Sequence, residues 1–278
     1  MPVFDKTRPF MASASRGAYT IIGIPLDLTT SYRPGTRFAP SAIREASYCL
    51  EEYDILYGGD LRERSFSDKG DIQLSGSLQQ ALEEIKEAIR EIINEQSLPI
   101  SIGGEHLVTF PVLSVLKEVF SDLYVIVLDA HADMRKEYNG LPLSHATVFR
   151  RVSEIIPYEK IFQFGIRSGS KEEADYYRTT GIYHSYEFPD DGFFKRLNGK
   201  RVYLSIDIDV LDPAFAPGTG TPEPYGWRPG DVLDFIKKLK GIRLAGADIV
   251  EVSPPYDPSG ITSLMAARII REIILFLT

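Results

Sequence analysis

Several features that mark specialised classes of protein are scarce or missing in this sequence. There is one cysteine, Cys49, so no disulfide can form within the chain. No segment approaches the roughly 20 apolar residues of a membrane-spanning helix. The N-terminal residues MPVFDKTRPF lack the basic segment and apolar run of a signal peptide. We therefore expect a cytoplasmic protein with no membrane partner, and we expect Cys49 to be buried on the inner face of a helix.

Positive charge is also in short supply. Lys and Arg number 31 against 39 Asp and Glu, which gives a formal net charge of −8. Because nucleic-acid binding calls for a basic patch, this balance argues against a nucleic-acid partner. An acidic surface attracts cationic small molecules instead. With 44% hydrophobic residues in 278, the chain can bury a large core.

Short apolar runs alternate with amphipathic segments along the whole chain. The runs at 19–24, 98–102, 124–128, 160–164, 201–206 and 244–250 are typical of parallel strands covered on both faces. The amphipathic segments have apolar residues at helical spacing and lie at 41–53, 77–96, 109–120, 228–238 and 262–276. This alternation predicts one parallel sheet sandwiched by helices, in a single α/β domain spanning residues 1–278.

Residues with metal-ligating side chains follow three of the predicted strands, in the motifs GGEH, DAHAD and DID. Ligands of open parallel sheets bind beyond the carboxyl ends of the strands. Residues two apart in an extended strand project the same way, so the side chains of each motif should converge. The candidate metal ligands are His106, Asp129, His131, Asp133, Asp207 and Asp209.

Four carboxylates at one sheet edge would repel each other and would be costly to desolvate, unless cations join them. Carboxylate oxygen with some imidazole and no thiolate suits manganese. Two divalent ions side by side would generate a hydroxide nucleophile at neutral pH. The motifs therefore predict a binuclear metal hydrolase. Asp212, which precedes a proline, is interpreted as a turn former.

Six segments resemble the arginase/agmatinase family of ureohydrolases. They are TTSYRPGTRFAPSAIREASY (29–48), GGEH (103–106), DAHAD (129–133), LSHAT (143–147), SIDIDVLDPAFAPGTGTPEP (205–224) and EVSPPYDPSGIT (251–262). The likeness covers nearly the whole chain and looks closer to agmatinases than to arginases. It implies a three-layer α/β/α fold with a central, mostly parallel sheet. It also implies a homo-oligomer, commonly a trimer or hexamer.

The resemblance further implies two Mn²⁺ per chain and divides the six ligands between them. One ion would be bound by His106 and Asp133, and the other by His131 and Asp209. Two residues, Asp129 and Asp207, would bridge both ions.

Glu251 and His145 are the candidate catalytic and substrate-binding residues. Glu251 follows the predicted strand 244–250, and its carboxylate can accept two parallel N–H bonds from a planar guanidinium group. His145 lies in the loop after DAHAD and is the candidate general acid or proton shuttle, because imidazole titrates near neutral pH. The resemblance implies the same roles. His184 matches no motif and is interpreted as structural or solvated.

The predicted reaction is hydrolysis of a cationic guanidino substrate to urea and an amine. Agmatine, which would yield putrescine for polyamine biosynthesis, is the preferred substrate. The loop 134–143 shows no clear match to the residues with which arginases hold arginine. In that loop, Glu137 and Tyr138 are candidates to receive the distal ammonium group of agmatine.

Other functions stay open at this point. The same chemistry could act on aminopropylagmatine, guanidinobutyrate, arginine or formimidoylglutamate. More distant alternatives are a binuclear metal phosphoesterase and a non-catalytic metal-binding scaffold. The sequence also departs from the family pattern at Glu105, where Asp is more common, and at Ala146, where Gly is usual. The second departure leaves the geometry around His145 open.

Overall fold

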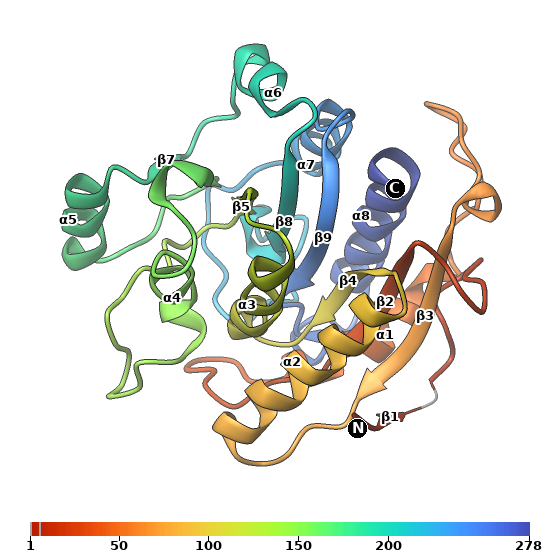
Figure 1. Ribbon diagram of the computed structural model, residues 1–278, viewed down its shortest axis with the longest axis horizontal. Coiled ribbons are helices and arrows are strands. Elements are labelled where there is room, and N and C mark those ends of the chain that lie inside the picture. The colour runs from red at the N-terminus through yellow and green to blue at the C-terminus, as the bar shows by residue number, and fades with distance from the viewer. Residues whose placement is uncertain (1, 6) are drawn as a thin grey trace.

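A nine-stranded sheet forms the centre of the molecule in the computed structural model, which describes residues 2–5 and 7–278 (Figure 1). Neighbouring strands run in the order β1-β3-β2-β4-β9-β8-β5-β6-β7. Each neighbouring pair is parallel except β1 with β3. The strands are β1 (Phe4–Asp5), β2 (Tyr19–Ile24), β3 (Phe66–Ile72), β4 (Leu98–Gly103), β5 (Leu123–Leu128), β6 (Ile161–Phe164), β7 (Tyr183–Ser185), β8 (Arg201–Asp207) and β9 (Arg243–Val250).

Helices cover both faces of this sheet. They are α1 (Ala39–Ser47), α2 (Leu78–Asn94), α3 (Thr109–Val119), α4 (Val148–Val152), α5 (Lys171–Thr180), α6 (Asp191–Leu197), α7 (Pro229–Lys238) and α8 (Ile261–Leu277). One hydrophobic core joins the sheet to α1, α6, α7 and α8, and a second joins its other face to α2, α3, α4 and α5. Figure 1 shows α2, α3 and α4 in front of the sheet. The predicted three-layer α/β/α fold is confirmed.

The central strands β4, β9, β8 and β5 position the candidate site. They are almost wholly buried because helices lie on both sides, which explains their apolar sequences. Their registers align the carboxyl ends: Ile206 of β8 lies opposite both Leu128 of β5 and Ile249 of β9. The motifs that follow these strands therefore meet at one edge of the sheet.

The sequence predicted the buried elements well and the polar ones poorly. The six predicted strands appear as β2, β4, β5, β6, β8 and β9, with bounds within one residue. The strand β3, with the polar sequence FSDKGDI, was not predicted, nor were β7, α4, α5 and α6. The helix expected over 41–53 ends at Ser47. Cys49 consequently lies beyond it and is exposed, so its predicted burial was wrong.

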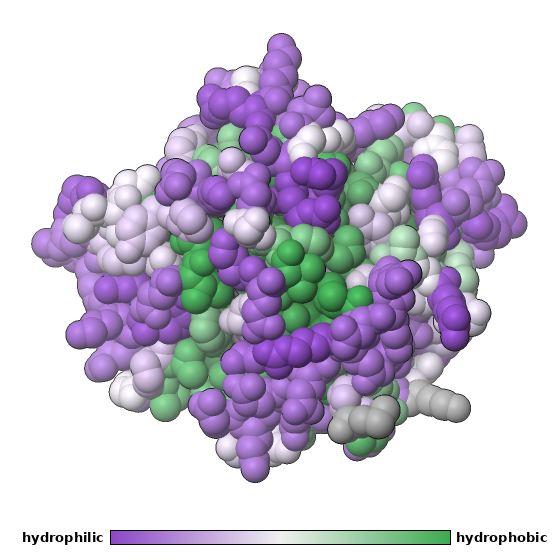
Figure 2. Space-filling model, viewed as in Figure 1, coloured by the Kyte–Doolittle hydropathy of each residue, from purple (hydrophilic) through white to green (hydrophobic). Residues whose placement is uncertain are grey.

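The outer surface of the helices in front of the sheet is mainly hydrophilic, with hydrophobic residues showing between them (Figure 2). This distribution is the one expected of amphipathic helices packed on a sheet. Within residues 2–5 and 7–278, no helix has both the length and the apolar character needed to cross a bilayer.

Candidate metal centre

The structure brings the six candidate ligands together at the carboxyl ends of β4, β5 and β8. Tight turns, more than strand pleating, produce the convergence, because β5 already ends at Leu128. The Asp129 carboxylate accepts a hydrogen bond from the backbone N–H of His131 at 2.6 Å. The Asp207 carboxylate likewise accepts one from the backbone N–H of Asp209 at 2.9 Å. Each motif thus curls around its own first aspartate.

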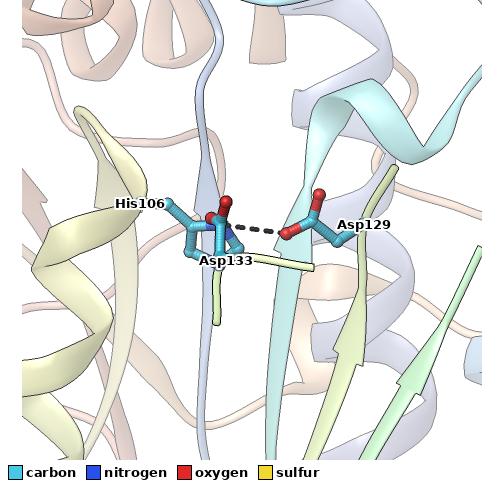
Figure 3. Close-up of side chains that lie close together, drawn as sticks. All are labelled: His106, Asp129 and Asp133. Atoms are coloured by element: carbon cyan, nitrogen blue, oxygen red, sulfur yellow. Dashed lines mark ion pairs between the residues drawn. The ribbon is translucent and has the colours of Figure 1, made fainter. Parts of the chain in front are cut away.

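Two groups of ligating atoms share Asp129. Nδ1 of His106 lies 3.2 Å from Oδ2 of Asp129, 3.3 Å from Oδ2 of Asp133 and 3.2 Å from Oδ2 of Asp207. Figure 3 shows His106, Asp133 and Asp129 pointing toward one another. In the second group, Nδ1 of His131 lies 2.9 Å from Oδ2 of Asp209 and 3.8 Å from Oδ1 of Asp129. Either group could hold a metal ion.

The polar atoms at the centre of these groups fit a cation. Nδ1 of His106, Oδ2 of Asp129 and Oδ2 of Asp209 are buried without a hydrogen-bond partner. Buried polar atoms are nearly always hydrogen-bonded, so three such atoms facing one space indicate a missing positive partner. In the part of the chain that the structure describes, no lysine or arginine forms an ion pair with the four carboxylates. Only histidines do.

A hydrogen-bonded chain behind His106 fixes which of its nitrogens carries the proton. The buried Asp248 carboxylate accepts hydrogen bonds from the hydroxyls of Ser205 at 2.6 Å, Tyr203 at 2.6 Å and Thr109 at 2.8 Å. Since the single Ser205 proton goes to Asp248, Ser205 accepts from Nε2–H of His106 at 3.0 Å. In the neutral ring, Nδ1 of His106 then carries the lone pair that a metal ligand needs. In the protein alone, burial would lower the pKa of His106, but the carboxylates of Asp129, Asp133 and Asp207 raise it well above its ordinary value.

The electrostatics of the protein alone show the same deficit of positive charge. Burial and the neighbouring carboxylates of Asp133 and Asp209 raise the pKa of Asp129 to about 7. Burial also raises the pKa of Asp207 well above its ordinary value. Burial alone would lower the pKa of His131, but the Asp209 carboxylate raises it to about 11. Without cations, this cluster holds protons at neutral pH.

Both candidate catalytic residues lie beside the ligands. Glu251, His145, His131, Asp133 and Asp207 all help to line one cavity of about 230 Å³. One carboxylate oxygen of Glu251 accepts a hydrogen bond from the backbone N–H of His106 at 2.8 Å, and burial raises the pKa of Glu251 well above its ordinary value. Burial lowers the pKa of His145, which favours neutral imidazole.

Two residues of the site have a strained backbone conformation. Glu251 has φ of 62° and Asp133 has φ of 50°, in the left-handed region that costs energy for residues with a side chain. Gly104 is needed for close approach rather than for a positive φ: a Cβ there would lie 1.9 Å from the carbonyl oxygen of Leu26. The loop after β2 therefore packs directly against the GGEH motif.

Several other predicted residues can also be placed. Asp212 accepts hydrogen bonds from the backbone N–H groups of Ala214 and Gly226, as expected of a turn former. His184 lies in β7 and stacks on Tyr177 with ring centroids 3.8 Å apart, and it does not line the cavity. Tyr138 lines the cavity, whereas the exposed Glu137 does not, so it is poorly placed to receive a substrate ammonium group.

Sequence reasoning missed the residues that support and line the site. Ser205 and Asp248 are polar residues inside otherwise apolar, buried strands, and a polar group in such a strand requires a partner. That signal could have identified them. Ser31, Arg135, Ser168 and Thr221 line the cavity from separate loops, and no pattern in the sequence connects them.

Comparison with known proteins gives a consistent result. The sequence matches the Arginase family over residues 18–276. It is 43% identical to an agmatinase of Halalkalibacterium halodurans, over 92% of this chain and 90% of the relative. It is also 43% identical to an agmatinase of Bacillus subtilis, over 98% and 95%. A crystal structure of a putative agmatinase from Clostridium difficile superposes with a TM-score of 0.89 at 42% identity, covering 94% of this chain and 97% of that one. The chain belongs to the arginase family.

Proposed function

We propose that this protein hydrolyses agmatine to urea and putrescine, with two Mn²⁺ held by His106, Asp129, His131, Asp133, Asp207 and Asp209. The observation that carries the proposal is a cluster of four buried carboxylates that has no lysine or arginine partner among the described residues. It opens into a cavity lined by Glu251 and His145. The identity of about 43% to agmatinases supports the choice of substrate.

The difficulty of the reaction lies in the electrophile. Resonance spreads the positive charge of a guanidinium group over three nitrogens, so its carbon reacts very slowly with water. Bound divalent cations would supply Lewis-acid charge and a nucleophile at neutral pH. The protein must still orient the guanidinium group, keep bulk water out and protonate the departing amine.

Glu251 is suited to orient the substrate. One of its oxygens is fixed by the backbone of His106, and the side chain lines the cavity next to Asp207 and His131. A carboxylate in this position can accept N–H bonds from a planar guanidinium group. The substrate's own positive charge would stabilise the ionised form of Glu251, which burial otherwise disfavours.

His145 is suited to move protons. It lines the same cavity, and its lowered pKa leaves a neutral ring that can accept a proton. As an imidazolium it would then donate that proton to the amine nitrogen as the C–N bond of the substrate breaks. Water, agmatine, urea and putrescine account for all atoms of the reaction.

One observation favours a second candidate substrate class. Arg135 lines the cavity and is only partly paired, since its Nε lies 3.7 Å from the Glu173 carboxylate. A guanidinium group there suits a substrate with a distal carboxylate, such as guanidinobutyrate, better than one with a distal ammonium group. Agmatine remains our proposal because the agmatinase relatives support it.

A urea-release assay with added Mn²⁺ tests both candidates. The panel is agmatine, arginine, guanidinobutyrate and aminopropylagmatine, and we expect the highest kcat/KM for agmatine. A preference for guanidinobutyrate that is lost in Arg135→Met would favour the second class. Phosphatase activity without urea release would contradict both. We further propose a cytoplasmic homo-oligomer, either a trimer or a hexamer, which light scattering of the purified protein will test.

A further inference from the structure

Glu105, one of the two departures from the family pattern, is fully buried and receives hydrogen bonds from the loop after β2. Its Oε2 accepts from the backbone N–H groups of Leu28 at 3.1 Å and Thr29 at 2.7 Å. The Thr30 hydroxyl lies 3.2 Å from the same oxygen and 2.8 Å from Oδ1 of Asp27, so it shares one proton between the two. Its Oε1 accepts from the Thr29 hydroxyl at 2.9 Å. The carboxylate therefore fixes both the backbone and the side chain of Thr29.

Thr29 in turn contacts His145 twice. Its Oγ accepts a hydrogen bond from the backbone N–H of His145 at 3.0 Å and lies 3.3 Å from Nδ1 of the ring. A threonine hydroxyl has one proton and two lone pairs. Because the proton is donated to Glu105, both contacts with His145 must use the lone pairs of Thr29. Nδ1 of His145 is then the donor and carries the ring proton.

The other ring nitrogen is left available. Among the described residues no hydrogen bond reaches Nε2 of His145, and this atom is accessible to solvent. The ring lines the cavity and meets the edge of Tyr138, with centroids 5.4 Å apart. Neutral His145 therefore presents the lone pair of Nε2, and not a proton, on the side away from Thr29.

We propose that Glu105 and Thr29 are positioning residues that act through His145: they orient its ring and select the tautomer with the proton on Nδ1. This inference rests on the proposed role of His145 in the hydrolysis of agmatine. In this relay the Glu105 carboxylate acts on the ring through the Thr29 hydroxyl, and Thr29 and His145 lie 116 positions apart in the sequence.

Thr29→Val removes the hydroxyl and keeps the shape of the side chain. We expect kcat for agmatine to fall by about 10–100-fold with little change in KM, because a positioned acid or base contributes roughly 10²–10⁴-fold. Thr29→Ser keeps the hydroxyl and should restore most of kcat. Thr30→Val is the control at the neighbouring position: it removes a hydroxyl that contacts the same carboxylate and Asp27 but has no hydrogen bond to His145, and kcat should stay near that of the wild type.

A double-mutant cycle separates positioning from general damage. In a His145→Asn background, Thr29→Val should cause no further loss of kcat, because its effect passes through the ring. An equal loss in both backgrounds, or a Thr29→Val protein as active as the wild type, would overturn the proposal.

Glu105→Gln gives an independent test if Thr29→Val does not fold. The amide oxygen of the new side chain should face the backbone N–H groups, so its NH₂ group faces Thr29. The Thr29 proton would then point to Nδ1 and shift the ring proton to Nε2, and kcat should fall without loss of bound Mn²⁺. Unchanged kcat in this variant would contradict the relay.

Failure of the relay can be distinguished from failure of the proposed function. If the wild-type protein released no urea from any substrate, the proposed function would fail. Crystal structures of the wild type and Thr29→Val would still decide the relay. A rotated His145 ring in the variant supports it, and an unchanged ring refutes it.

Discussion

Two regions of the molecule bury several carboxylates, and they neutralise them in different ways. At β3, the side chains of Asp68 and Asp71 surround Arg44 of α1, whose side chain is 1% exposed. Nε and Nη2 of Arg44 donate to the two oxygens of Asp68 at 2.8 and 3.0 Å, and Arg44 also pairs with Asp71. This region supplies its own cation.

Among the described residues, the cluster at the ends of β5 and β8 forms ion pairs with His106 and His131 and with no lysine or arginine. In the protein alone, burial and the neighbouring carboxylates raise the pKa of Asp129 to about 7, whereas, against the effect of burial, the His131 ring lowers the pKa of Asp209 to about 2. A buried charge persists only when it is paired. The comparison teaches that buried acid alone does not indicate a metal site. Several buried carboxylates in contact do, when they have no arginine or lysine partner and some of their oxygens lack a hydrogen-bond donor.

The largest expected effect comes from breaking the cluster itself. Asp207→Asn should abolish urea release and reduce bound Mn²⁺ to well below two ions per chain. The loss of activity should exceed the roughly 100-fold that removal of a residue behind a metal ligand costs. Elemental analysis and the urea assay measure both quantities. Full retention of metal and turnover would contradict the assignment of Asp207 as a bridging ligand.

The matched change at β3 should act on stability instead. Arg44→Met leaves Asp68 buried without a cation and should lower the free energy of unfolding by about 3–5 kcal/mol. Denaturant unfolding measures it, and added Mn²⁺ should not restore the loss. If Arg44→Met were as stable as the wild type, the contrast between the two regions would fail.

A smaller effect is expected behind His106. Ser205→Ala removes the acceptor for Nε2–H of His106 and frees its ring, so the affinity for Mn²⁺ should fall by about 10–100-fold. Equilibrium dialysis gives the affinity directly. Ser101→Ala, a change at another buried serine of the sheet, is the control and should bind Mn²⁺ as the wild type does.

The smallest expected effect is the pH dependence of metal affinity, because protons compete with the metal for His131. The raised pKa of His131, about 11, means that the metal-free fold holds this proton through neutral pH. The stability it confers is present below the ordinary pKa of histidine and is lost as pH rises through about 11. A metal must displace the proton, so affinity should fall roughly tenfold per unit decrease in pH for each proton displaced. Calorimetric titrations at two pH values test this, and an affinity independent of pH would count against it.

The sequence predicts the site better than it predicts the edges of the fold. Buried parallel strands have continuous apolar sequences, so β5, β8 and the motifs after them can be identified from the sequence alone. The strand β3, which lies second from one edge of the sheet, was not predicted, because its charged residues Asp68 and Asp71 are compensated by Arg44 from α1, 24 positions or more away. Such pairing depends on the tertiary structure and cannot be identified from the local sequence of β3.

The support of His145 shows the same limit. His145 was found from its motif, but Glu105 reaches it only through Thr29, and Thr29 and His145 are 116 positions apart. Only folding brings the loop after β2 onto GGEH, by way of the close contact that Gly104 permits. Residue types and spacing identify the groups that do chemistry, whereas the residues that orient them require coordinates.

The most direct measurement of the central claim is the number of Mn²⁺ ions bound by the folded wild-type protein after dialysis. If the four buried carboxylates depend on outside cations, the folded chain should hold two ions, and their removal should lower its free energy of unfolding. At free Mn²⁺ of about 100 times Kd the stabilisation should be roughly 2.7 kcal/mol for each site. A protein that is fully folded, equally stable with and without Mn²⁺, and free of bound divalent ions would contradict the account.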